Sequence, residues 1–142
     1  MRFAEFNIGD AFKTNPVIAD KNDMLSYAEK YDPQYFHLDE AAATKSPYGS
    51  IIASGFYTIT VVWAEFVRMN VLGEDCLGGL GMDNIRWKLP VKPNDRLIGE
   101  YQILGKKMLS DGKRGILEVG IRIQNQDNDE VVTLQTKILV KA

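Results

Sequence analysis

The longest apolar stretch of the chain lies in its middle. From residue 51 to residue 67 nearly every residue is apolar or small, and only Glu65 is charged. A helix that is apolar all round is one enclosed by the rest of its protein, so we expect a central helix over residues 54–72. At the usual rise per residue this helix would be ~28 Å long, enough to cross a small domain.

The second half of the chain alternates apolar and polar residues with a period of two, which predicts strands. The expected strands cover residues 82–91, 95–109, 113–126 and 130–141, after a loop over residues 73–81. Turn residues at 110–112 and 127–129 make the last three strands antiparallel neighbours. The pattern therefore predicts an α+β fold in which one long helix is wrapped by an antiparallel sheet.

The first half predicts a short strand over residues 11–18 and two helices. Asp20 is the expected N-cap of a helix over residues 21–31, with Asp23 as its capping-box acid. Asp39 is the expected N-cap of a short helix over residues 40–45. The stretch between these helices is expected to be mostly loop, since Pro33 prevents simple continuation of the first one.

Composition limits the classes of protein that the chain can belong to. With 142 residues, 45% hydrophobic and 25% charged, it is expected to form a single globular domain. A formal net charge of -2 and the lack of a basic, aromatic stretch argue against a nucleic-acid partner. No run reaches the roughly 18 apolar residues of a membrane span, and no signal peptide is expected. The single cysteine, Cys76, favours a cytoplasmic location.

The loop after the first predicted helix holds a carboxylate and an imidazole, Asp32 and His37, and His37 is the only histidine of the chain. Such a pair can hold and polarise a water molecule and exchange protons near neutral pH. The structural alternative is that Asp32 satisfies turn amides and His37 fills a surface position. For Asp39 the N-cap interpretation is favoured. One histidine and no cysteine cluster provide poorly for a metal, so we expect neither metal nor cofactor.

The start of the predicted central helix offers another kind of group. If the helix begins at Ser54, the free N–H groups of Gly55 and Phe56 point out of its N-terminus, where an oxygen that gains negative charge is stabilised. The structural alternative is that Ser54 is only an N-cap and Gly55 a tight packing contact. The local sequence does not decide between these two interpretations of Ser54 and Gly55.

Together these positions resemble the hydratase motif of the MaoC-like dehydratase family. In that motif an Asp, a His five residues later, an acidic residue and an alanine precede a helix that begins Ile-Ala-(His/Ser)-Gly. The matching residues are Asp32, His37, Asp39, Ala43, Ile52, Ala53, Ser54 and Gly55. The later stretch LGMDNIRWKLPVKPNDRL also resembles the family, in which a strand ends in a proline-containing corner before an Asp opens the next strand.

The resemblance implies the hot-dog fold and a homodimer that adds water to a 2-enoyl thioester of coenzyme A or of an acyl carrier protein. Asp32 and His37 would activate the water, and the Gly55 amide would polarise the thioester carbonyl. Tyr31, Ser54 and Phe56 are the expected substrate-binding residues.

The chain departs from the well-known members of the family at three places. Gln34-Tyr35 stands where those hydratases have Asn-Pro, Ser54 replaces a histidine, and Trp63 replaces a hydroxyl-bearing residue further along the helix. Two alternatives remain beside the hydratase: an acyl-binding module without turnover, and a thioesterase. The module is expected to lack the Asp or the His, and free thiol is released only by a thioesterase.

Overall fold

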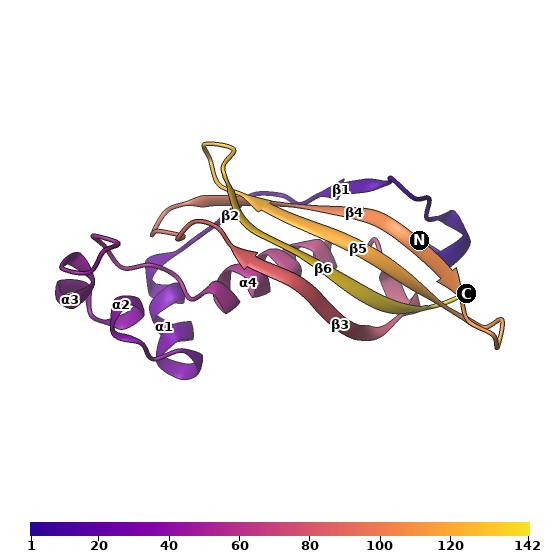
Figure 1. Ribbon diagram of the computed structural model, residues 1–142, viewed down its shortest axis with the longest axis horizontal. Helices are drawn as coiled ribbons and strands as arrows, with labels where there is room; N and C mark the ends of the chain where they lie inside the picture. Colours follow the sequence, from indigo (N-terminus) through magenta and orange to yellow (C-terminus); the bar gives the residue numbers. More distant parts are fainter.

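The protein folds as an antiparallel sheet that curls over one side of a long helix, α4 (Gly55–Arg68) (Figure 1). The computed structural model describes residues 1–142. Neighbouring strands follow the order β1-β4-β5-β6-β3, and β2 pairs with β4 beside this path. The strands are β1 (Ala11–Lys13), β2 (Val17–Ile18), β3 (Cys76–Trp87), β4 (Arg96–Met108), β5 (Arg114–Gln124) and β6 (Glu130–Lys141). All pairings are antiparallel.

The last three strands form the predicted meander, because β4 pairs with β5 and β5 with β6. Their bounds lie within two residues of the predicted ones. Buried and less buried residues alternate along all three strands, as expected for a sheet with one face on the core. Over most of these strands the period-two pattern therefore indicates which side chains face the core.

The strand before this meander differs from its prediction at both ends. Residues 73–81 are not a loop: a 3-10 turn, η2 (Gly73–Asp75), leads directly into β3 at Cys76. The glycine-rich start of β3 is held by its pairing with β6, where Gly79 faces Ile138, and register shifts on either side accommodate extra residues. The strand ends at Trp87 and does not continue to residue 91, since Pro90 has no N–H to donate.

The predicted strand over residues 11–18 is two strands, β1 and β2. Pro16 lies between them and has no amide hydrogen for a continuous ladder. Thr14, next to this break, joins it to β4: its N–H donates to the Gly99 carbonyl and its hydroxyl accepts from the Gly99 amide.

Three short helices precede α4: α1 (Lys21–Tyr31), α2 (Tyr35–Leu38) and α3 (Glu40–Thr44). Asp20 and Asp39 cap α1 and α3 as predicted, with their carboxylates accepting from the amides three residues on. Asp23 does not close a capping box, because its carboxylate accepts a hydrogen bond from the Tyr57 hydroxyl. The helix α2 lies where the sequence predicts loop.

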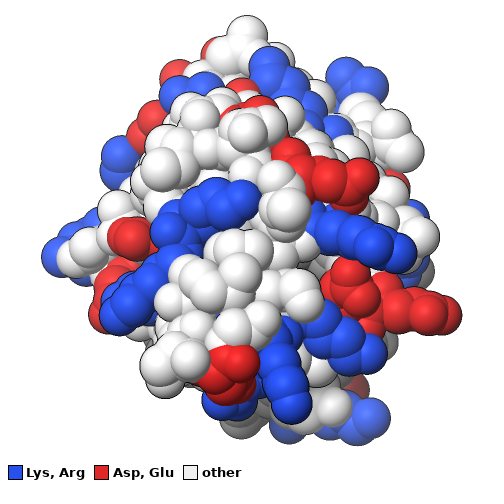
Figure 2. Space-filling view, turned by 90° about the vertical axis from the view of Figure 1, so that its right-hand side faces the viewer, with Lys and Arg blue, Asp and Glu red and all other residues white.

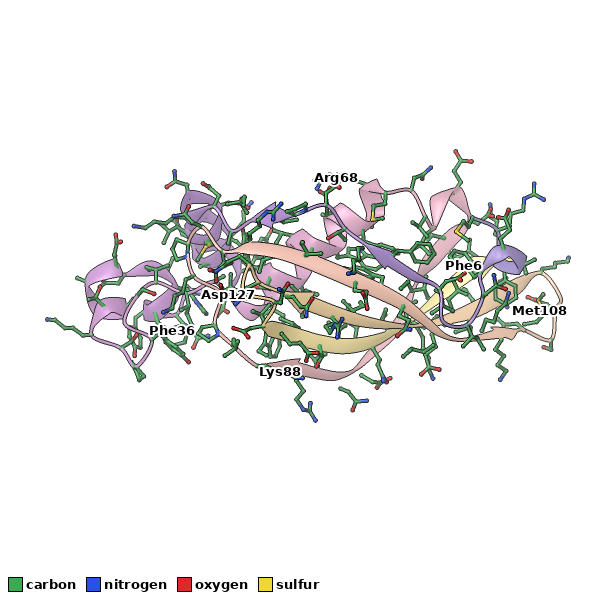
Figure 3. The ribbon with its side chains drawn as sticks, turned by 90° about the horizontal axis from the view of Figure 1, so that it is seen from above. Phe6, Phe36, Arg68, Lys88, Met108 and Asp127 are labelled. Carbon is green, nitrogen blue, oxygen red and sulfur yellow. The ribbon has the colours of Figure 1, made fainter.

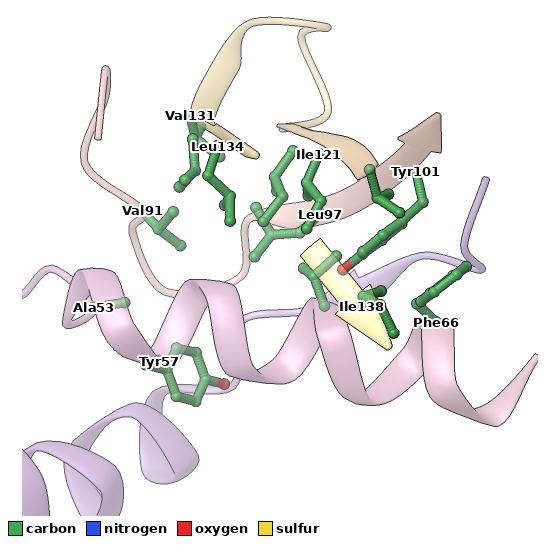
Figure 4. Close-up of a cluster of buried hydrophobic side chains, with 14 of the residues drawn as sticks. Ala53, Tyr57, Phe66, Val91, Leu97, Tyr101, Ile121, Val131, Leu134 and Ile138 are labelled. Carbon is green, nitrogen blue, oxygen red and sulfur yellow. The ribbon is translucent and has the colours of Figure 1, made fainter. Parts of the chain in front are cut away.

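The core lies between α4 and the concave face of the sheet, where 24 buried residues form one cluster (Figure 4). Phe66 of α4 stacks on Tyr101 of β4 with ring centroids 4.0 Å apart. Near the middle of the helix Val62 is fully buried, and a Cβ built on Gly99 would lie 2.4 Å from its Cγ1. The absence of a side chain at Gly99 is what lets α4 approach β4 so closely.

The helix α4 differs from the prediction in length and in burial. It ends at Arg68, four residues before the predicted end, and Asn70 then has a positive φ of 59° that ends helical conformation. A single chain does not enclose it: Phe56 and Val67 are each more than half exposed. The apolar character all round the helix is therefore not explained by the core of one chain alone.

The two ends of the molecule hold different elements (Figure 1). Figure 3 shows Phe36 and Lys88 toward the end that holds the short helices, and Phe6 and Met108 toward the other end. At that other end Lys and Arg side chains are interspersed with Asp and Glu, so the face carries both signs of charge (Figure 2). None of the helices has the length and apolar character needed to cross a membrane.

Candidate active site

A cavity of about 400 Å³ opens where α1, α2 and the start of α4 meet the segment that follows β3. Its polar lining includes Asp32, Gln34, His37, Thr58 and Lys88, and its aromatic lining is Phe36, Tyr48, Phe56 and Trp87. Most of the remaining lining is aliphatic. A mostly apolar cavity with a few placed polar groups is typical of a small-molecule site.

Asp32 lies at the C-terminus of α1 and its carboxylate is held by three groups. Its Oδ1 accepts from Gln34 Nε2 at 2.8 Å, and its Oδ2 accepts from the Ser54 hydroxyl at 2.7 Å. The same Oδ2 lies 3.3 Å from His37 Nε2. Burial alone would raise the pKa of the Asp32 carboxyl, but these hydrogen bonds and the charge attraction of His37 outweigh it and hold the pKa below its usual value.

His37 lies on α2 and its side chain is 5% exposed. Its Nδ1 is 2.8 Å from the Ile52 carbonyl oxygen, which can only accept, so Nδ1 carries the hydrogen of this bond. In the neutral ring Nε2 is then an acceptor, and in the charged ring it donates to Asp32. The backbone thus fixes the tautomer, which leaves Nε2 as the nitrogen that gains or loses a proton.

The extended segment before α4 aligns these groups. The Ile52 amide donates to the Phe36 carbonyl, and the Ala53 amide donates to the Val91 carbonyl. Because Ile52 and Ala53 are also almost fully buried, the segment is fixed between α2 and the chain that follows β3. The Ile52 carbonyl that binds His37 Nδ1 is therefore fixed by main-chain hydrogen bonds of buried residues.

Gly55 opens α4 and packs against the Trp87 ring. A Cβ built on Gly55 would lie 2.2 Å from Trp87 Nε1, so Gly55 is the tight packing contact of the structural alternative. The oxyanion-binding interpretation stays a prediction: the N–H groups of Gly55 and Phe56 in the first turn of α4 have no acceptor within the protein, as it requires. Gly55 and Phe56 both line the cavity.

Ser54 takes the N-cap position of α4, but its side chain makes no cap hydrogen bond. Its hydroxyl turns to Asp32, and the residue is 1% exposed and does not line the cavity. Tyr31 does not line the cavity either: its ring packs on Tyr27 with centroids 5.1 Å apart and is largely exposed. Trp63 packs on Phe66 and Tyr101, away from the cavity.

Gln34, Thr58 and Trp87 are among the cavity residues that the sequence did not predict as site residues. Thr58 carries a signal that could have found it, since it lies three residues after Gly55 and therefore on the same helix face. Trp87 carries none, because its place over Gly55 depends on how β3 ends. Asp39 stays outside the cavity as a cap, and no three acidic, histidine or cysteine side chains converge to hold a metal ion.

Comparison with known proteins gives one consistent result. The model of the MaoC-like domain matches residues 3–123. The uncharacterized protein YdeM of Bacillus subtilis is 33% identical over 99% of each chain. Among solved structures, a MaoC-like dehydratase of Rhodospirillum rubrum is 26% identical with a TM-score of 0.91, over 99% of this chain and 97% of that one. An R-hydratase of Pseudomonas aeruginosa is 25% identical with a TM-score of 0.77, over 98% and 84%.

Proposed function

The chain belongs to the MaoC-like domain family and has its hot-dog fold, and from this premise we propose that it is an acyl-thioester hydratase. The proposed reaction is the reversible addition of water to a 2-enoyl thioester, which gives a 3-hydroxyacyl thioester. One observation carries the proposal: Asp32 and His37 touch inside a mostly apolar cavity that also receives the free amides of a helix N-terminus.

In the proposed hydration, a water molecule bound to Asp32 and His37 attacks C3 of the enoyl group. An O–H bond of the water breaks and a C3–O bond forms, while the π electrons of the C2–C3 bond move to the thioester oxygen. The Gly55 amide and the positive end of α4 stabilise the negative charge on this oxygen. The proton taken by the Asp32–His37 pair then forms the new C–H bond at C2, so atoms and charges balance.

The site geometry restricts where the water can bind. With 3.3 Å between Asp32 Oδ2 and His37 Nε2, no water fits between the two side chains. The water is therefore proposed to contact both from the open side of the cavity, where it also faces the acyl group. The Nδ1 hydrogen bond to Ile52 keeps the imidazole plane fixed while Nε2 exchanges its proton.

The proposed substrate is a thioester of coenzyme A or of an acyl carrier protein, and the proposed assembly is a homodimer. A cytoplasmic location stays a prediction from the lone Cys76. The similar R-hydratase of Pseudomonas aeruginosa supports the reaction class, and it does not specify the acyl group taken by this chain.

The first prediction tests the two proposed catalytic residues with a short enoyl thioester, crotonyl-CoA. Asp32→Asn keeps the shape of the side chain and removes its charge, and His37→Ala removes the imidazole. Each is expected to lower the hydration rate about a hundredfold to ten-thousandfold, measured as loss of the enoyl absorbance. The double variant is expected to lose little more than the worse single one, because both groups act on one water.

The matched control is Asp127→Asn, the same change in the loop between β5 and β6, which is expected to leave the rate unchanged. Thiol release is followed in parallel. Rapid release of free coenzyme A without loss of the double bond would identify a thioesterase. Saturable binding of the thioester with no reaction at all would identify a binding module.

A further inference from the structure

Thr58 is the buried residue of the cavity lining whose polar side chain has no hydrogen-bond partner. Thr58 lies one turn beyond Gly55 on α4, lines the cavity and is 2% exposed. Two other helical threonines, Thr44 and Thr60, donate their hydroxyls to the carbonyl four residues earlier. Thr58 forms no such bond, and its hydroxyl has no other partner in the protein.

The open space beside Thr58 follows from its burial. Every side-chain nitrogen or oxygen that is fully enclosed in this protein has a hydrogen-bond partner. An unpartnered hydroxyl on so buried a residue must therefore retain contact with open space, and the cavity is the space that Thr58 borders. A hydroxyl without a partner is costly in an apolar environment, so a bound molecule with an oxygen at this point would be favoured.

The residues around Thr58 limit the kind of molecule that could supply this oxygen. Ile52, Val91 and Val132 line the same cavity and offer only apolar side chains. Thr58 lies ~4.5 Å along the helix from Gly55, given the rise of an α-helix. A ligand whose thioester oxygen meets the Gly55 amide would thus bring an oxygen a few bonds along its acyl chain to the Thr58 hydroxyl.

We propose that Thr58 is a substrate-binding residue whose hydroxyl hydrogen-bonds the oxygen on C3 of the acyl group. It holds the 3-hydroxyl when water leaves, and the incoming water when it adds. The inference rests on the proposed hydratase function and deepens it, because it assigns a group that distinguishes 3-hydroxyacyl from saturated acyl thioesters.

The test compares Thr58→Val, which keeps the shape of the side chain, with Thr58→Ser, which keeps the hydroxyl. The matched control is Thr60→Val, the same change on an exposed position of the same helix. Calorimetry measures binding of butyryl-CoA, which has no oxygen on C3, and of both enantiomers of 3-hydroxybutyryl-CoA. All variants carry Asp32→Asn in this measurement, so that the hydroxy ligands are turned over slowly.

Thr58→Val is expected to weaken one enantiomer of 3-hydroxybutyryl-CoA about three- to tenfold and to leave butyryl-CoA unchanged, as for the loss of one neutral hydrogen bond. Thr58→Ser is expected to restore the affinity, and Thr60→Val to change neither ligand. In the chain with Asp32 intact, Thr58→Val is expected to lower kcat/KM for crotonyl-CoA by a similar factor.

Equal weakening of butyryl-CoA and 3-hydroxybutyryl-CoA, or no weakening of either, overturns the assignment of Thr58. If Thr58→Val does not fold, Thr58→Ala replaces it and the same comparison decides. Failure of the proposed function has a different signature: the wild-type chain would then not hydrate crotonyl-CoA, whatever Thr58 does to binding.

Discussion

At the scale of single residues, two side chains besides His37 lower the pKa of Asp32. Gln34 and Ser54 each donate to one carboxylate oxygen, and both bonds are to the charged form. The lowered pKa stabilises the folded state at neutral pH, and this contribution is lost as the pH falls through the folded-state pKa. The same bonds keep Asp32 ionised for its proposed role.

Removal of the Ser54 hydroxyl should shift the pH dependence of the proposed reaction. In Ser54→Ala one hydrogen bond to the Asp32 carboxylate is lost, so the pKa of Asp32 rises toward its usual value. The acid limb of the kcat/KM profile for crotonyl-CoA is expected to move to higher pH, with a loss of about tenfold at neutral pH from poorer alignment of the carboxylate. An unchanged acid limb would show that Ser54 has no part in setting the state of Asp32.

The control variant for that measurement is Ser50→Ala. The Ser50 hydroxyl donates to a backbone carbonyl of Ile51 and does not contact Asp32. Its profile is expected to overlay the wild-type profile, which separates an effect on Asp32 from a general effect of serine removal near α4.

At the scale of elements, the approach of α4 to β4 depends on Gly99. A Cβ on this residue would lie 2.4 Å from Val62 Cγ1 and 3.0 Å from Tyr101 Cε1, and both neighbours are buried. Neither side chain can turn to solvent. The helix or the strand must therefore shift to accept any larger residue.

Gly99→Ala is expected to lower the free energy of unfolding by about 1–3 kcal/mol, the usual cost of overpacking a core. Gly79→Ala on β3 is the control, since a Cβ at Gly79 would meet nothing within 4 Å, and its effect is expected to stay within about 0.5 kcal/mol. Urea unfolding followed by circular dichroism measures both. Equal midpoints for the two variants would contradict the close contact between Gly99 and Val62.

The sequence alone predicted the elements whose local residue pattern matches their place in the fold. The alternation of β4, β5 and β6 and the caps Asp20 and Asp39 are of this kind. The start of β3 is different: Gly78, Gly79 and Gly81 have low strand propensity, and only their pairing with β6 holds them extended. The helix α2 was not predicted because four residues without a side-chain cap carry almost no local signal.

The candidate site was predictable to the extent that its residues are close in sequence. Asp32 and His37 lie five residues apart, and the resemblance to a known motif predicted that they share one site, although their direct contact at 3.3 Å was not foreseen. The bond from Ser54 to Asp32 spans 22 residues and contradicts the simple expectation that a serine at an N-cap bonds its own helix. Departures from local sequence rules are typical of functional sites, where a polar side chain often bonds a site residue and not its own helix.

At the scale of the whole molecule, two apolar surfaces of one chain lack a cover. The strand β3 ends the sheet, so its outer edge pairs with no strand, and Leu77, Leu80 and Met82 on it are exposed. The second surface is the side of α4 that carries Phe56 and Val67. Exposed apolar edges of this kind promote association, and pairing about a two-fold axis would cover the same surfaces in both copies.

We expect a homodimer in solution, with a mass by light scattering of about twice the 16.0 kDa of one chain. Leu80→Glu, which places a charge on the β3 edge, is expected to give the mass of a single chain at micromolar concentration. Ile8→Glu is the control, because Ile8 is also exposed but precedes β1 at the opposite edge of the sheet. A wild-type mass of 16.0 kDa would contradict the prediction.

The hydrogen bond from His37 to Ile52 has an evolutionary consequence. Its acceptor is a main-chain carbonyl, so no substitution at position 52 removes the acceptor, and an apolar residue there preserves the tautomer of His37. The donors to Asp32 are the side chains of Gln34 and Ser54, and each can be lost in one mutational step. Descendants of this chain could therefore change the acidity of the aspartate by substitution at two positions, while the acceptor that fixes the histidine tautomer persists with the fold.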